Sequence, residues 1–171
     1  MNHPSYHLWV KPSGASYELL DRTIRRLAGE LAAPVFAPHV TLVGHLEGTE
    51  REHVRRTEEL ARRLAPFDVF LTEPRWGDQY FQCIFMLVEE TVALRNANAL
   101  ARRLFQRGDE RYMPHLSLVY GSYSEARKRG IVESLPAELR TAFRASAIYL
   151  IRSDSDDPAD WHELMDQPMH A

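Results

Sequence analysis

Hydrophobic and polar residues alternate with a period of two in two similar stretches of the chain. The sequence reads PHVTLVG at residues 38–44 and PHLSLVYG at residues 114–121. This alternation predicts a half-buried β-strand in each stretch. Because successive side chains of a strand point to opposite faces, each histidine shares a face with the hydroxyl residue two places later. The pattern predicts two strands that each present one imidazole and one hydroxyl to the same space.

The rest of the chain alternates between helical and strand patterns. Apolar residues at helical spacing, together with capping residues, predict helices at 16–33, 49–65 and 91–106 and a short helix that begins at 124. Further strands are expected at 6–10, 67–73, 79–88, 143–151 and 161–165. Residues 67–73 and 79–88 should form a hairpin, and the second of them should lie inside a sheet because it is apolar on both faces.

The order of these elements is roughly repeated before and after the hairpin. A duplicated pattern predicts two similar half-domains that face each other across a cleft. No linker or low-complexity tract separates them. We therefore expect residues 1–171 to form a single bilobal domain.

Composition narrows the class of protein. The 171 residues carry a formal net charge of −3, with an estimated pI near 6.2, and this balance favours a small nucleotide over a long nucleic acid as partner. The longest apolar run, 83–88, is far too short to cross a membrane, and the first residues lack a signal-peptide pattern, so a cytoplasmic protein is expected. The single cysteine, Cys83, excludes an intramolecular disulfide.

The two motifs supply the groups that phosphodiester hydrolysis requires. If His39 and His115 face each other across one cleft, one of them could serve as general base and the other as general acid, because the ordinary pKa of imidazole, about 6.5, lies near the working pH. Thr41 and Ser117 could hold the phosphoryl oxygens. If the strand continues to His45, this residue lies on the same face as His39. No carboxylate or cysteine stands at ligand spacing beside it, so we predict no metal site. His53 is expected to be solvated.

These residues resemble a known family, the two-histidine (2H) phosphoesterases. The paired His-x-Thr and His-x-Ser motifs, Trp9, and the stretches at 80–87 and 112–120 are similar to the cyclic phosphodiesterase branch of plants and yeast. The resemblance implies an α+β fold of two pseudo-symmetric lobes, with antiparallel sheets and outer helices around a central cleft. It also implies a reaction that needs no metal or other cofactor.

The resemblance further implies the substrate and its contacts. The reaction would open either a nucleoside 2',3'-cyclic phosphate to the 2'-phosphate, or ADP-ribose 1'',2''-cyclic phosphate to ADP-ribose 1''-phosphate. Trp9 would stand at the mouth of the cleft, where it could stack on a base, although a core position is an equal alternative. The resemblance also places Tyr120 in the substrate site. Phe81, at the start of the apolar strand 79–88, is expected from the strand pattern to reach the cleft and contact substrate. By parity, Tyr120 lies on the wrong face, so it reaches the cleft only if the strand bends or bulges near Gly121.

Several alternatives stay open from the sequence. We expect His115 to be the base and His39 the acid, but the motifs are nearly symmetric and the roles could be reversed. The same motifs could act on RNA ends, or the protein could bind nucleotides without chemistry. A monomer is expected.

Overall fold

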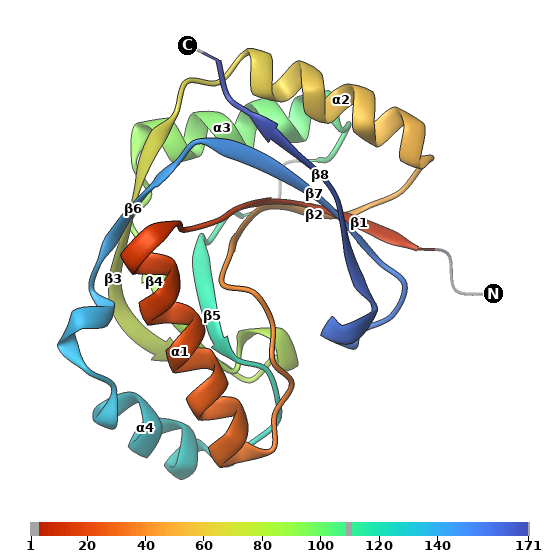
Figure 1. The fold of residues 1–171 in the computed structure, drawn as a ribbon. Helices are drawn as coiled ribbons and strands as arrows, with labels where there is room; N and C mark the ends of the chain where they lie inside the picture. The colour runs from red at the N-terminus through yellow and green to blue at the C-terminus, as the bar shows by residue number, and fades with distance from the viewer. Residues whose placement is uncertain (1–3, 109–110, 171) are drawn as a thin grey trace.

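The computed structural model describes residues 4–108 and 111–170 (Figure 1). Its strands form one antiparallel sheet in the order β6-β3-β4-β5-β2-β1-β7-β8. The strands are β1 (Ser5–Val10), β2 (Val40–Leu46), β3 (Phe67–Trp76), β4 (Ile84–Val88), β5 (His115–Val119), β6 (Ala142–Ala145), β7 (Ala147–Ser153) and β8 (Trp161–Pro168). The α-helices are α1 (Gly14–Leu31), α2 (Glu50–Arg62), α3 (Val92–Leu104) and α4 (Glu125–Ser134).

The sheet curls into two halves that meet at the motif strands. One half holds β6, β3, β4 and β5, and the other holds β2, β1, β7 and β8. They join where Val40 of β2 pairs with Leu116 of β5, each the residue directly after a motif histidine. Helices α1 and α4 pack against β5 and β3, whereas α2 packs against β7 and β8 and α3 against β2 (Figure 1). The expected two-lobed α+β fold is confirmed, and this junction brings both motifs to its centre.

Helix starts follow the predicted capping residues in three of four cases. Thr49 accepts a hydrogen bond from the Glu52 amide in a complete capping box, Thr91 caps α3, and Ser124 caps α4. Helix α1 instead begins at Gly14, and the Ser16 hydroxyl donates to the carbonyl of Ala142 in β6. The expected cap at Ser16 is therefore wrong, because this hydroxyl bonds across to the sheet.

Strand boundaries differ from the expectation where the chain changes direction. The hairpin of β3 and β4 forms, and β4 lies inside the sheet as predicted, but residues 80–82 make a turn of 3₁₀-helix. The expected strand at 143–151 is two strands, β6 and β7, which lie at distant places in the sheet. Between them the carbonyl of Ser146 accepts from the Met169 amide, so this residue bonds outside both ladders.

His53 is buried, which contradicts its expected exposure. The residue is 1% exposed, and the centroid of its ring lies 4.5 Å from that of Tyr6 and 5.7 Å from that of Phe105. Burial lowers the pKa of His53. Helix α2 buries His53 and Thr57 beside Leu60 and Ala61, so two polar residues belong to its packed face.

Candidate active site

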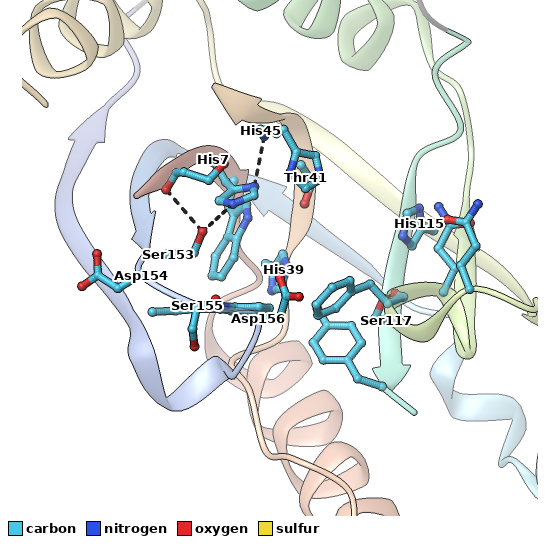
Figure 2. Close-up of a pocket in the computed structure, with 18 residues that line it drawn as sticks. His7, His39, Thr41, His45, His115, Ser117, Ser153, Asp154, Ser155 and Asp156 are labelled. Carbon is cyan, nitrogen blue, oxygen red and sulfur yellow. Dashed lines mark hydrogen bonds between the residues drawn. The ribbon is translucent and has the colours of Figure 1, made fainter. Parts of the chain in front are cut away.

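A pocket of about 690 Å³ lies at the junction of the two halves. Figure 2 shows His39 and Thr41 on one side of it and His115 and Ser117 on the other. The seven residues that the sequence singled out all line this pocket: Trp9, His39, Thr41, Phe81, His115, Ser117 and Tyr120. The fold therefore brings both motifs and the three aromatic candidates into one space.

The two motif histidines have the same local geometry. Nδ1 of His39 donates to the carbonyl oxygen of Ala37 at 2.7 Å, and Nδ1 of His115 donates to that of Met113 at 3.0 Å. In each case the acceptor lies two residues before the histidine. A carbonyl can only accept, so the proton of the neutral ring resides on Nδ1 and Nε2 carries the lone pair. Each imidazole thus has Nε2 as its proton-accepting atom.

Burial sets the charge state of both rings. His39 is 7% exposed, and desolvation lowers its pKa to about 3, more than the hydrogen bond to Ala37 can offset. The positive charge of Lys11 lowers it further. Burial also lowers the pKa of His115 from its ordinary value of 6.5. Both imidazoles are therefore neutral at pH 7 in the free protein.

The two motif hydroxyls differ in their surroundings. Thr41 is half-buried, and its side chain lines the pocket. Ser117 is buried, and its Oγ donates to the carbonyl oxygen of Phe81 at 2.9 Å. Burial raises the pKa of the Tyr120 phenol. The Ser117 hydroxyl therefore ties the loop at 80–82 to the second motif.

Tyr120 reaches the pocket through the irregularity that the parity argument required. Opposite β4, Ser117 pairs with Phe85 but Val119 pairs with Ile84, so β5 contains one extra residue. This shift has the signature of a β-bulge, which reverses the facing of the residues beyond it. The following Gly121 has φ of +153°, a conformation that favours glycine.

Trp9 takes the buried position, one of the two alternatives that the sequence left open. Its ring stacks on that of His39, with centroids 3.5 Å apart and planes 10° apart, and only 5% of the residue is exposed. One face of the indole is thus covered by the imidazole. Trp9 lines the pocket beside His39 and does not stand at its mouth, so it is better placed to position this histidine than to bind a base.

His7 and Ser153 form a hydrogen-bonded group that the motif analysis missed. The His45 amide donates to Nδ1 of His7 at 3.4 Å, and Nε2 of His7 lies 2.9 Å from Oγ of Ser153, which reaches the Ser5 carbonyl at 3.3 Å (Figure 2). Burial lowers the pKa of His7 to about 4. A period-two reading of β1 could have found this group, since residues 5, 7 and 9 all line the pocket.

Lys128 of α4 holds the loop that carries Phe81. This lysine is 4% exposed, and Nζ donates to the carbonyl of Gly77 at 2.7 Å and to Oδ1 of Asp78 at 2.9 Å. A Cβ at position 77 would lie 2.7 Å from the Gln82 carbonyl, so the loop closes only around a glycine. The sequence showed no sign of this contact, because Lys128 lies about 50 residues from its partners.

Within residues 4–108 and 111–170, no three histidine, cysteine, aspartate or glutamate side chains are grouped so that they could hold a metal ion. No helix among these residues has the length and apolar character to span a membrane.

Comparisons with known proteins identify a family and a relative for this chain. A family model described as cyclic phosphodiesterase-like protein matches residues 5–146. The chain is 27% identical to a cyclic phosphodiesterase of Arabidopsis thaliana over 157 residues, which cover 89% of this chain and 87% of the relative.

Two solved structures share the fold. Escherichia coli LigT in complex with 3'-AMP superimposes with a TM-score of 0.69 at 13% identity, covering 99% of this chain and 100% of that one. A Thermus thermophilus protein superimposes with a TM-score of 0.63 at 17% identity, covering 96% and 97% of the two chains. At these identities the superpositions establish the fold alone.

Proposed function

The chain belongs to the cyclic phosphodiesterase-like family of 2H phosphoesterases, and from that premise we propose that it opens nucleoside 2',3'-cyclic phosphates to 2'-phosphates without a metal ion. One observation carries the proposal. His39 and His115 are both anchored through Nδ1 and line one pocket from two motif strands that pair with each other. Two such imidazoles meet the need for one proton acceptor and one proton donor.

The reaction balances with these two groups. Nε2 of neutral His115 takes a proton from water as the water oxygen attacks phosphorus. The bond between phosphorus and the 3' oxygen breaks, and the imidazolium of His39 donates a proton to that oxygen. The products are a 2'-phosphate and a 3'-hydroxyl, and the two histidines have exchanged protonation states. The opposite assignment balances equally, since the two rings have the same local geometry.

The low pKa of His39 limits how the acid form arises. At about 3, this pKa leaves the ring neutral in the empty pocket at pH 7. A bound phosphodiester anion next to the ring would favour the charged form and raise the pKa. The proton that the acid donates is therefore held in place by the charge of the substrate. The hydroxyls of Thr41 and Ser117 would bond the two non-bridging oxygens, with Ser117 rotating from the Phe81 carbonyl.

The fold relatives support a nucleotide substrate. Structures of LigT have been solved with 3'-AMP and with NADP+, so this fold accepts nucleotides of different length. In our structure, a second pocket of about 200 Å³ shares Thr41 and His115 with the site and is lined by Arg102, Arg107 and Arg111. Such a lining supports ADP-ribose 1'',2''-cyclic phosphate as a second candidate, since its diphosphate could lie there.

Phosphorus NMR tests the proposed activity. The purified protein is incubated with adenosine 2',3'-cyclic phosphate in excess EDTA, and the cyclic signal should be replaced by a single 2'-phosphate resonance. Loss of activity in EDTA that returns with added metal ion would contradict metal-free chemistry. An unchanged signal both with EDTA and with added metal would exclude simple cyclic nucleotides. Parallel samples with ADP-ribose 1'',2''-cyclic phosphate and with an RNA end bearing a 2',3'-cyclic phosphate test the alternatives.

The pH dependence of kcat/KM should reflect the two lowered pKa values. The active form holds one proton between the two imidazoles, and kcat/KM reports the free enzyme. Above the pKa of His115, which lies below 6.5, both rings are neutral, and below the pKa of His39, about 3, both are charged. We therefore expect a bell-shaped profile with its maximum at acidic pH between these limits.

The profile of kcat provides the comparison. Bound substrate anion stabilises the imidazolium, so kcat should reach its maximum at a higher pH than kcat/KM. Steady-state rates measured across the pH range with a constant ionic strength check both statements. A maximum of kcat/KM at pH 8 or above would show that the buried imidazoles do not set the rate.

A further inference from the structure

The C-terminal hairpin builds a wall of the pocket from outside the family match. The family model ends at residue 146, whereas Trp161 lines the pocket from β8. Residues 153–156 line it from the end of β7 and the turn that follows (Figure 2). Trp161 is the first residue of β8 and is half-buried. A large aromatic side chain that lines a pocket and keeps exposed surface can contact a ligand.

Hydrogen bonds fix the indole of Trp161 in the pocket wall. Its Nε1 donates to the carbonyl of Ser155 at 2.9 Å. The turn is itself ordered, because the Ser155 hydroxyl donates to Asp160 at 2.6 Å and the Ala159 amide donates to Asp157 at 2.9 Å. The polar edge of the indole is thus satisfied by the protein, which leaves its aromatic face for contact with other rings.

The neighbouring rings surround Trp161 without covering it by parallel stacking. Its centroid lies 5.8 Å from Trp9 at 68°, 5.9 Å from Tyr120 at 59° and 6.1 Å from Phe81 at 42°. Trp9, by contrast, is stacked on His39 with planes 10° apart. No parallel ring therefore covers Trp161, which keeps part of its surface exposed, whereas Trp9 is only 5% exposed; Phe81 borders the same pocket.

The end of the pocket near Trp161 differs in charge from the end near Thr41 and His115. Asp154 and Asp156 line it, and the guanidinium of Arg152 lowers the pKa of Asp154, so this carboxylate is ionised. The arginine-lined second pocket lies beyond Thr41 and His115. Because Asp154 is paired with Arg152, Asp156 is the carboxylate that would repel a further phosphate, whereas an uncharged nucleobase would not be repelled. The base end of a nucleotide therefore fits the side of Trp161.

We propose that Trp161 is the base-stacking residue of this site and that it binds the nucleobase of the cyclic nucleotide beside Phe81, the role that the family resemblance suggested for Trp9. This inference rests on the proposed function and names the residue that recognises the nucleoside part of the substrate. Aromatic stacking tolerates every base, because each base has a π face, so the contact favours nucleosides over base-free sugars rather than one base over another.

Two substrates and three variants test the proposal. Adenosine 2',3'-cyclic phosphate is compared with the base-free methyl riboside 2,3-cyclic phosphate, using Trp161→Ala, Trp161→Leu and Trp161→Phe. Loss of the stack should raise KM for the nucleotide roughly tenfold in the alanine and leucine variants, with kcat within about twofold of wild type. KM for the base-free compound should not change, and Trp161→Phe should keep most of the affinity. Gln167→Ala, on the same strand but outside the pocket lining, is the control.

Several outcomes would overturn the inference. An equal rise in KM for both substrates, an unchanged KM, or a fall in kcat alone would show that Trp161 does not hold the base. Trp161→Leu retains apolar volume, and it replaces Trp161→Ala in the KM comparison if the alanine variant does not fold. If the wild type turns over neither compound, the proposed activity is wrong, and this result does not itself test the stacking contact. Calorimetry then measures the affinity of wild type and of Trp161→Leu for 2'-AMP and for ribose 2-phosphate. If Trp161 stacks on the base, Trp161→Leu should weaken binding of 2'-AMP only, and this result does not require turnover.

Discussion

Replacing His39 or His115 by glutamine lowers kcat for ring opening by about 10²- to 10⁴-fold, the contribution typical of a positioned acid or base. Each substitution removes the Nε2 that accepts or donates the proton. Glutamine is chosen because His39 packs against Trp9 at a centroid distance of 3.5 Å, and a side chain of similar length limits the loss of packing. Steady-state hydrolysis of adenosine 2',3'-cyclic phosphate measures the effect.

The double variant and a surface control sharpen this result. Because the two imidazoles act in one proton-transfer step, the double variant should lose little more than the worse single variant. His162→Ala removes an exposed histidine that does not line the pocket and should retain wild-type rates. Turnover near the wild-type value in either glutamine variant would end the two-histidine mechanism.

Removing the hydroxyl of Thr41 or Ser117 should reduce kcat by about 10²- to 10³-fold, the loss typical of one donor to a developing oxyanion. Thr41→Val preserves the shape of the side chain, and Ser117→Ala removes only the oxygen. The effect should appear mainly in kcat, because negative charge on the phosphoryl oxygens is greatest in the transition state. Thr41→Ser and Ser117→Thr keep the hydroxyl and should retain most of the activity.

Thermal unfolding separates the two hydroxyl variants. Ser117→Ala leaves the Phe81 carbonyl without its 2.9 Å partner, so its stability should fall by about 1–3 kcal/mol. Thr41→Val removes no hydrogen bond of the Thr41 side chain that is seen among the described residues, and its stability should stay close to that of wild type. If kcat of both variants stays within about threefold of wild type, the hydroxyls do not bind the transition state.

Local signals explain why much of the fold could be predicted. The alternation around His39 and His115 predicted the two motif strands, and caps at Thr49, Thr91 and Ser124 predicted three helix starts. Each of these features depends on residues within a few positions of one another. The backbone conformation of such a stretch follows from its own side chains, so a single sequence is sufficient to predict it.

Tyr120 and Trp9 show where the local argument reached its limit. Parity placed Tyr120 on the wrong face, and only the extra residue of β5 opposite β4 returned it to the pocket. For Trp9 the sequence left the cleft mouth and the core as equal alternatives, because no local feature revealed that His39 covers its ring. Both outcomes depend on strands that are distant in the sequence.

The sequence by itself determined the residues of the two motifs, their strand character and the chemistry available to them. Tertiary structure alone decided that β2 pairs with β5, that Lys128 holds the loop of Phe81, and that Trp161 closes the pocket. These contacts join segments tens of residues apart, and they form because each buries apolar surface or satisfies a buried polar group. No local pattern encodes such a partner, since the partner's position is set by the packing of the whole sheet.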